Sequence, residues 1–227
     1  METAHIAQLL GPYLTHSGPA LPASQFALSE EQLRSISIYI DILLRWNSRI
    51  NLTAVREPEE IVRRHFGESL FTARHLFPDP FDQPPTHVID MGSGAGFPGL
   101  PIKLWFPQAR VTLIESNHKK AAFLREVVRA VTLTDINVFA ARAETYQGPL
   151  GNVVTLRAVE KFEAALPIAE RLAAPGGQLA LLIGEARAQT AVDLGKFVRW
   201  SKAIQLPESV SRILLVGTVN RSLQASG

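Results

Sequence analysis

Alternating glycines in the first half of the chain are the residues best suited to bind a reactive group. Gly92, Gly94 and Gly96 follow the acid Asp90, which closes an apolar run. Glycine is used where the backbone needs a positive φ or where a ligand must touch the main chain. Pro98 stands where a helix can begin, because the first N–H groups of a helix have no intrahelical partner. The pattern predicts a strand, a loop and a helix start that presents free N–H groups to a nucleotide-type cofactor.

A second acid, Glu115, closes the next apolar run, about twenty residues after the glycines. An acid at the end of a second parallel strand can accept hydrogen bonds from ribose hydroxyls, so an adenosine group is expected. The glycines fit two arrangements. Gly94, Gly96 and Gly99 fit the dinucleotide fingerprint, which is weak evidence by itself. Asp90 with the alternating glycines fits the loop of S-adenosylmethionine enzymes.

Charge favours the second arrangement. S-adenosylmethionine carries a sulfonium and an ammonium group, and it has no pyrophosphate to place at a helix N-terminus. A carboxylate such as Asp90, at the end of the first strand, suits that cationic ligand and would repel a pyrophosphate. We therefore expect S-adenosylmethionine as cofactor. NAD or a relative is the alternative ligand, and a tight turn without a ligand is the structural alternative.

The elements that must hold this loop fall into two regions, residues 1–85 and 86–227. The first is expected to be a helical N-terminal extension with a linker. Ser29 can cap a helix with one apolar face, and a second helix is expected from Glu59 to His75 after Pro58. Turn-forming residues predict an irregular start and a final linker: Pro12, Gly18, Pro19, Pro22, and the prolines from 78 to 85.

From residue 86 onward, short apolar runs alternate with helical spacing. Strands are expected at Thr86–Met91, Arg110–Glu115, Ile136–Ala140, Asn152–Leu156 and Gln178–Ile183. Helices are expected at Pro98–Phe106, His118–Val131, Lys161–Ala173 and Glu185–Trp200. Ala203–Leu206 and Arg212–Val219 have no helix between them and predict an antiparallel hairpin. This alternation predicts an α/β fold, the layout expected of a Rossmann-like methyltransferase, with a mostly parallel sheet and a C-terminal antiparallel strand.

Composition limits the class of protein. The 227 residues, 46% of them hydrophobic, suffice for one full core with an extension. Without cysteine there can be no disulfide or thiolate metal site, and we expect no metal. No apolar run approaches the roughly 18 residues of a membrane helix, so a cytoplasmic protein without membrane contact is expected. A net charge of +2 is weak support for a nucleic-acid partner.

Further motifs make the chain resemble a known family. They are Trp46–Thr53, Arg64–Leu70, Gly92–Gly99, Glu115–Leu124, Ala143–Glu144 and Arg157–Val159. In this order they resemble the bacterial small-subunit rRNA guanine-N7 methyltransferases, the RsmG (GidB) family, from about Leu44 to about Arg157. Several long, independent blocks are far more specific than a glycine loop alone.

The resemblance implies methyl transfer from S-adenosylmethionine to N7 of one guanine of 16S rRNA, near the decoding region of the small ribosomal subunit. It also implies that Gly92 and Phe97 bind the cofactor, and that Ala143 and Glu144 meet its adenine. Arg157 would lie beside both cofactor and target. We expect a monomer.

Three departures from the family concern charge. Glu68 stands where the family usually has Asp, which keeps the negative charge. Ile183 replaces a usual Lys, and no Lys follows Arg212 near the C-terminus. Two missing cations could weaken contacts with RNA phosphates, and they leave the cofactor assignment unchanged.

The expected chemistry needs few catalytic groups. Guanine N7 carries no proton, so the transfer needs alignment and desolvation rather than a general base, and we expect no acid–base pair. Arg157 is expected to position the target guanine or its phosphate through its planar guanidinium, with a structural ion pair as the alternative.

The roles of several polar residues before the glycine loop stay open. Asn47 and Asn51 can cap and brace the junction between the two regions or reach the cofactor, and His65 can be structural or a contact near the site. An arginine cluster can follow RNA phosphates or form a salt-bridged surface with nearby acids: Arg45, Arg49, Arg56, Arg63 and Arg64. Trp46 is expected to pack in the core.

Three other functions also remain open. A small-molecule methyltransferase would share the cofactor half of the chain but should lack Trp46–Thr53 and Arg64–Leu70. A nicotinamide oxidoreductase would need a second nucleotide-binding half, for which no second glycine fingerprint follows Arg157. A non-catalytic S-adenosylmethionine sensor is the third.

Overall fold

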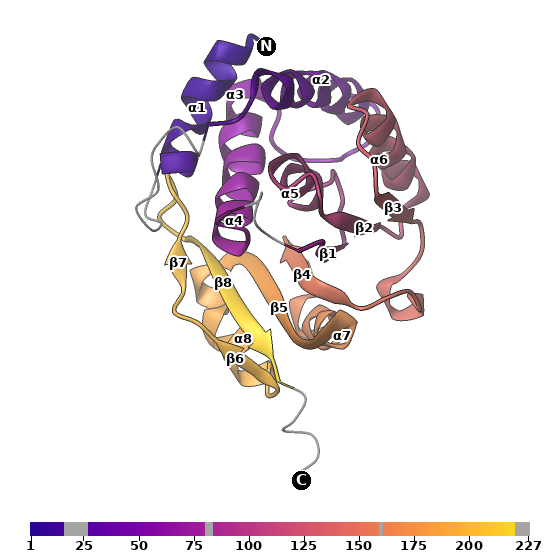
Figure 1. Ribbon diagram of the computed structural model, residues 1–227, viewed down its shortest axis with the longest axis vertical. Coiled ribbons are helices and arrows are strands. Elements are labelled where there is room, and N and C mark those ends of the chain that lie inside the picture. The colour runs from indigo at the N-terminus through magenta and orange to yellow at the C-terminus, as the bar shows by residue number, and fades with distance from the viewer. Residues whose placement is uncertain (16–26, 80–83, 159–160, 221–227) are drawn as a thin grey trace.

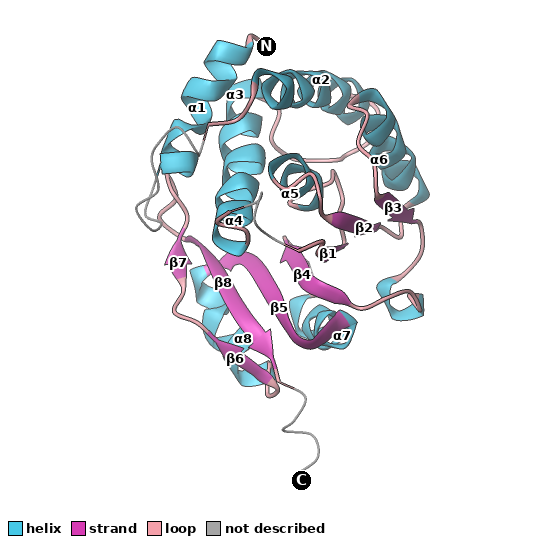
Figure 2. Cartoon of the chain, in the orientation of Figure 1, coloured by secondary structure: helices cyan, strands magenta, loops and turns pink. Residues whose placement is uncertain are grey.

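The computed structural model describes residues 1–15, 27–79, 84–158 and 161–220. Gly18, Pro19, Pro22 and the centre of the expected linker lie outside these ranges. Helices alone form the N-terminal part of the chain, and the strands begin at residue 87 (Figure 2). In the described ranges, no helix is both long and apolar enough to cross a membrane.

An eight-stranded mixed sheet forms the centre of the protein, in the order β3-β2-β1-β4-β5-β8-β6, with β7 paired to β8. The parallel strands are β1 His87–Met91, β2 Arg110–Ile114, β3 Ile136–Phe139, β4 Gly151–Arg157 and β5 Ala173–Gly184. The antiparallel strands are β6 Val198–Trp200, β7 Ile204–Gln205 and β8 Arg212–Val219. The expected C-terminal hairpin is therefore confirmed, because β7 and β8 pair antiparallel.

Helices cover both faces of this sheet (Figure 1). One face carries α5 Gly99–Trp105 and α6 His118–Ala130, together with the N-terminal helices. The other carries α7 Phe162–Leu172 and α8 Ala188–Leu194. Neighbouring residues of a strand point to opposite faces. Val88 accordingly lies in the first core and Ile89 in the second.

The N-terminal helices share the first core with α5 and α6. They are α1 Thr3–Thr15, α2 Glu30–Asn47, α3 Pro58–Ile61 and α4 Glu68–Leu76. Ser29 caps α2 in a capping box with Gln32, as its residue type predicts. A π-helical turn, Val62–Gly67, joins α3 to α4, so the second expected helix is one helical run with a widened middle.

Two sequence-based expectations were wrong. The start of the chain is helix α1 rather than irregular, and it includes Pro12. Its apolar residues, such as Ile6 and Leu10, are fully buried, and this packing outweighs the proline. The expected helix Glu185–Trp200 is a 3₁₀ turn and the short α8, followed by strand β6. Val198–Trp200, the last three residues of the expected helix, form a strand because they pair with the edge of β8.

Candidate cofactor and substrate site

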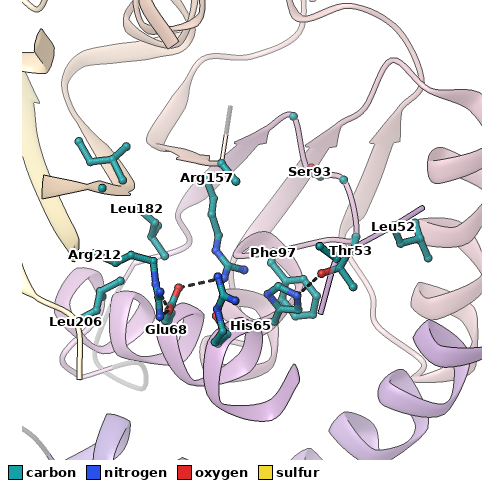
Figure 3. A pocket seen from close by; sticks show the side chains of 18 of the residues that line it. Leu52, Thr53, His65, Glu68, Ser93, Phe97, Arg157, Leu182, Leu206 and Arg212 are labelled. Carbon is teal, nitrogen blue, oxygen red and sulfur yellow. Dashed lines mark hydrogen bonds and ion pairs between the residues drawn. The ribbon is translucent and has the colours of Figure 1, made fainter. Parts of the chain in front are cut away.

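A cavity of about 440 Å³ lies where β1, β2, β4 and β5 end (Figure 3). The carboxyl ends of parallel strands are the usual ligand side of an α/β sheet. The wall of the cavity combines the glycine loop with two N-terminal segments, Leu52–Ala54 and the π-helical turn. Residues from both regions of the chain therefore enclose one site.

The glycines of the loop divide into two kinds. Gly92, Gly94 and Gly96 have φ values of +73°, +55° and +87°, which disfavour any side chain. Gly92 and Gly94 line the cavity, and a Cβ on Gly92 would meet nothing within 4 Å. Gly96 instead faces the core, where a Cβ would lie 2.7 Å from Leu100. The first two glycines therefore leave bare main chain for a ligand, and the third allows close packing.

Asp90 lies behind the loop, 1% exposed, rather than in the cavity wall. Its carboxylate accepts hydrogen bonds from the Thr155 hydroxyl at 2.7 Å and the Gly99 N–H at 3.2 Å. A Cβ on Gly99 would come 2.8 Å from the Asp90 Cβ, so glycine is what lets α5 approach this closely. Burial raises the pKa of Asp90 to about 6, although both hydrogen bonds oppose the shift. This placement differs from the direct contact with a cationic ligand that the sequence suggested: Asp90 joins β1, β4 and α5.

Glu115 lies at the end of β2 and does line the cavity. One carboxylate oxygen accepts the Gly94 N–H at 2.9 Å, and the other accepts the Asn117 N–H at 2.7 Å. A carboxylate offers about four acceptor positions, so two remain for ligand hydroxyls. Glu115 therefore fixes the loop and can still bind a ribose.

A buried carboxylate joins two arginines on the opposite side of the cavity (Figure 3). Glu68, 1% exposed, pairs with Arg157 at 3.1 Å and with Arg212 at 2.6 Å. Arg157 is 13% exposed and also donates to the Arg64 carbonyl at 2.5 Å. The structure thus holds Arg157 in an ion pair and also places it in the cavity wall.

His65 packs beside this group, with its ring 4.9 Å from the Phe97 ring. Its Nε2 lies 2.7 Å from the Thr53 hydroxyl. Burial, followed by the positive charges of Arg157 and Arg64, lowers the pKa of His65 to about 2. The guanidinium of Arg157 is 5.8 Å from the centre of the Phe97 ring. His65 is therefore a neutral member of an aromatic and cationic wall.

Several sequence-predicted residues lie outside the cavity wall. Ala143 and Glu144 belong to a short 3₁₀ turn, where Glu144 pairs with Arg142 at 3.3 Å. Arg63 pairs with Glu59 at 3.2 Å. Neither group lines the cavity.

Asn47 is a brace. It accepts the N–H groups of Leu52 and Thr53 and donates to the Thr53 carbonyl at 3.0 Å. Asn51 is exposed and does not line the cavity. Trp46 contacts Phe123 and donates to Glu126 at 2.9 Å, so it packs between α2 and α6 as expected.

Sequence reasoning missed much of the wall. The missed residues are Leu52, Thr53, Ala54, Glu68, Ser93, Ala95, Lys120, Ala158, Leu182, Ile183, Gly184, Arg187, Leu206 and Arg212. Glu68 and Ile183 were noted as departures from the family and Arg212 only as the residue after which a Lys is missing, and none of the three was expected in the site. A usable signal was Glu68 itself, an acid beside the apolar Phe66 and Leu70 of a helix that must face the core.

A model of the family described as rRNA small subunit methyltransferase G matches residues 32–210. The chain belongs to this family. Ribosomal RNA small subunit methyltransferase G of Chloroflexus aggregans is 38% identical over 203 residues, covering 84% of this chain and 83% of that protein. The protein of the same name from Aquifex aeolicus is 44% identical over 147 residues, covering 65% and 74%.

Solved structures of other methyltransferases have the same fold as this chain. A SAM-dependent methyltransferase from Aquifex aeolicus has a TM-score of 0.53 at 16% identity, covering 65% of this chain and 89% of that one. A precorrin-6y C5,15-methyltransferase from Geobacter metallireducens has a TM-score of 0.51 at 14% identity, covering 65% and 87%. The expected Rossmann-like methyltransferase fold is confirmed. The chain is an S-adenosylmethionine-dependent methyltransferase of this family, and S-adenosylmethionine is its cofactor.

Proposed function

We propose that this protein transfers a methyl group from S-adenosylmethionine to N7 of one guanine of 16S rRNA, near the decoding region of the small subunit. Its relatives carry the name of ribosomal RNA methyltransferases, which supports an rRNA substrate. The choice of a ring nitrogen rests on one observation. The described cavity wall holds no side chain that can act as a general base near neutral pH.

The histidine and the two carboxylates of that wall are poorly placed to act as a base. Burial and the nearby arginines lower the pKa of His65 to about 2, which makes it a weak base. Glu68 is held by two arginines, and both oxygens of Glu115 accept main-chain N–H groups. A hydroxyl or amino target would have to lose a proton during methylation. Guanine N7 has a free in-plane lone pair and loses none.

The side chains then act by binding and alignment. The cofactor supplies a methyl group on a positively charged sulfur, and an attacking lone pair can displace it directly. Glu115 binds the ribose, and the bare main chain of Gly92 and Gly94 lies against the cofactor. Arg157, fixed by Glu68, positions the target nucleotide through its remaining N–H donors.

Three further assignments belong to this proposal. Ala143 and Glu144 contact the adenine from the edge of the site. Residues 86–227 form the cofactor-binding domain, and the helical extension, residues 1–85, completes the substrate side. The role of the extension is supported by Leu52–Ala54 and the π-helical turn, which line the same cavity as the glycine loop. The protein acts as a monomer.

Methyl transfer to ribosomal RNA tests the function directly. Labelled S-adenosylmethionine is offered with 30S subunits and with free 16S rRNA, both lacking the modification. The product is mapped by strand cleavage that depends on N7 methylation. We expect one labelled guanine near the decoding region. Label at another atom, or none on either RNA, would refute the proposal.

Variants separate substrate positioning from folding. Arg157→Ala should lower kcat/KM for RNA far more than it lowers S-adenosylmethionine affinity. Arg110→Ala is the matched control, since Arg110 is an exposed arginine at the opposite end of the sheet, where β2 begins. A variant that loses cofactor binding and keeps transfer at saturating cofactor would contradict the role of Arg157.

The pH dependence provides a second test. With no general base to deprotonate, kcat/KM should be flat from about pH 7 to pH 9. A tenfold rise per pH unit over that range would indicate proton removal from the target, and would favour a different acceptor atom.

A further inference from the structure

The exposed cations of the N-terminal helices, of the loops between them and of α6 are of two kinds. Many are paired with nearby acids: Arg34 with Glu30, Arg45 with Glu126, Arg63 with Glu59, and Arg64 with Glu60. A paired cation adds little to the field outside the protein, because the acid beside it cancels its charge. The arginine cluster seen in the sequence is thus largely neutralised. What matters for an anionic partner is the set of cations without such acids.

Arg49, Lys119 and Lys120 are such cations. In the described parts of the chain, none of the three side chains forms an ion pair or hydrogen bond. Arg49 and Lys119 are exposed and Lys120 is half-buried. Arg56 also forms no ion pair in the described ranges, but the residue after it, Glu57, is an exposed acid that likewise has none, so the two charges offset one another in the field outside the protein.

The fold brings these three cations to one side of the cavity. Lys120 lines the cavity together with Leu52–Ala54, which follow Arg49 in the loop between α2 and α3. Trp46, three residues before Arg49, packs on Phe123 and donates a hydrogen bond to Glu126, so the C-terminal end of α2 lies against α6. The N-terminus of α6 carries Lys119 and adds the positive end of its dipole. On the other side of the cavity, Arg212 is already paired with Glu68.

We propose that Arg49, Lys119 and Lys120 form a basic rim that binds the phosphates of the RNA strand flanking the target nucleotide. This inference rests on the proposed rRNA substrate and adds the surface that holds it. Unpaired, solvated cations beside a ligand cavity suit a phosphodiester backbone, because each bound phosphate releases condensed counterions. The rim sets affinity and orientation, while the cavity itself selects the base.

The salt dependence of RNA binding measures how many phosphate contacts the basic rim makes. Binding of the full-length protein to unmodified 16S rRNA is followed from 50 to 300 mM KCl. Each lost phosphate contact lowers the slope of log K against log salt by about 0.7 to 0.9. Changing all three residues to alanine should therefore flatten the slope by roughly 2 to 3. At 150 mM salt this corresponds to an affinity loss on the order of a hundredfold.

A second triple variant controls for net charge. Arg34→Ala, Arg45→Ala and Arg63→Ala remove the same three charges, but each of these arginines is paired with an acid. This variant should keep the wild-type slope, and thermal unfolding checks that both variants are folded. Equal flattening in both triple variants, or none in the rim variant, would overturn the inference. Failure of wild-type methyl transfer counts instead against the proposed function, and the slopes still test the rim on the same RNA.

Discussion

Removal of the negative charge of Glu68 is the most demanding test of the site. Its carboxylate is almost fully buried and holds two arginines that come from β4 and β8. In Glu68→Gln the side chain keeps its size and loses its charge, so Arg157 is left buried at 13% exposure without a counterion. Breaking a buried ion pair by removing one partner costs about 3–5 kcal/mol.

The loss in free energy of unfolding caused by Glu68→Gln should lie at the lower end of that range. Arg212 is 32% exposed, so solvent screens much of its interaction, and most of the loss comes from Arg157. We expect Glu68→Gln to lower the free energy of unfolding by about 3 kcal/mol. For a protein of this size, that shifts Tm by about 6–12 °C. Glu68→Asp should lose less, because it keeps the charge.

Urea unfolding at pH 7 measures this loss, and thermal unfolding gives a second value. Glu60→Gln is the control: Glu60 is 49% exposed and pairs with Arg64 at 3.2 Å, so its loss should cost less than about 1 kcal/mol. In an Arg157→Met background, the cost of Glu68→Gln should shrink, since the unpaired charge is gone. A Glu68→Gln protein as stable as wild type would refute the buried ion-pair argument.

Three other perturbations test the loop and its support. Glu115→Gln should weaken S-adenosylmethionine binding by roughly 1.5–3 kcal/mol in calorimetry, and unchanged affinity would contradict the ribose contact. The pKa of Asp90 rises from an unfolded value near 4 to about 6 in the folded protein, so its contribution to stability is lost as pH rises from about 4 to 6. Urea unfolding of wild type against Asp90→Asn across that window should show the decline only in wild type, and parallel curves would contradict the shift. Gly67→Ala should cost about 1–3 kcal/mol, because its Cβ would meet the Tyr13 ring at 2.6 Å, and Tyr13→Ala should relieve part of the cost.

Much of the cofactor side could be predicted from local sequence. Strand, glycine loop and acid follow one another along the chain, so their spacing alone predicts their places at the sheet edge. The orientation of Asp90 could not be predicted. It depends on Thr155, a residue of the neighbouring strand β4, and on the close approach of α5 that Gly99 permits.

The substrate side was harder because its contacts are distant in sequence. Glu68 and Arg212 are 144 residues apart, and only the antiparallel pairing of β8 with β5 brings them together. The arginine cluster shows the same limit. Arg63 and Arg64 are neutralised by acids four residues before them, but Arg45 is neutralised by Glu126 of α6, which is distant in sequence. Local charge patterns could therefore not separate Arg45 from Arg49.

The π-helical turn explains how a distant contact shapes the substrate side. At its end, the N–H of Glu68, the first residue of α4, donates to the His65 carbonyl, and the Arg64 carbonyl accepts from Arg157. The turn and this first residue of α4 together supply a carbonyl for Arg157, a neutral ring against Phe97, and a buried carboxylate. The turn packs closely against α1 because Gly67 has no Cβ to meet the Tyr13 ring. Helix α1 contributes no residue to the cavity wall, but it packs against the turn that holds Arg157. We therefore expect deletion of α1 to disturb substrate positioning more than cofactor binding.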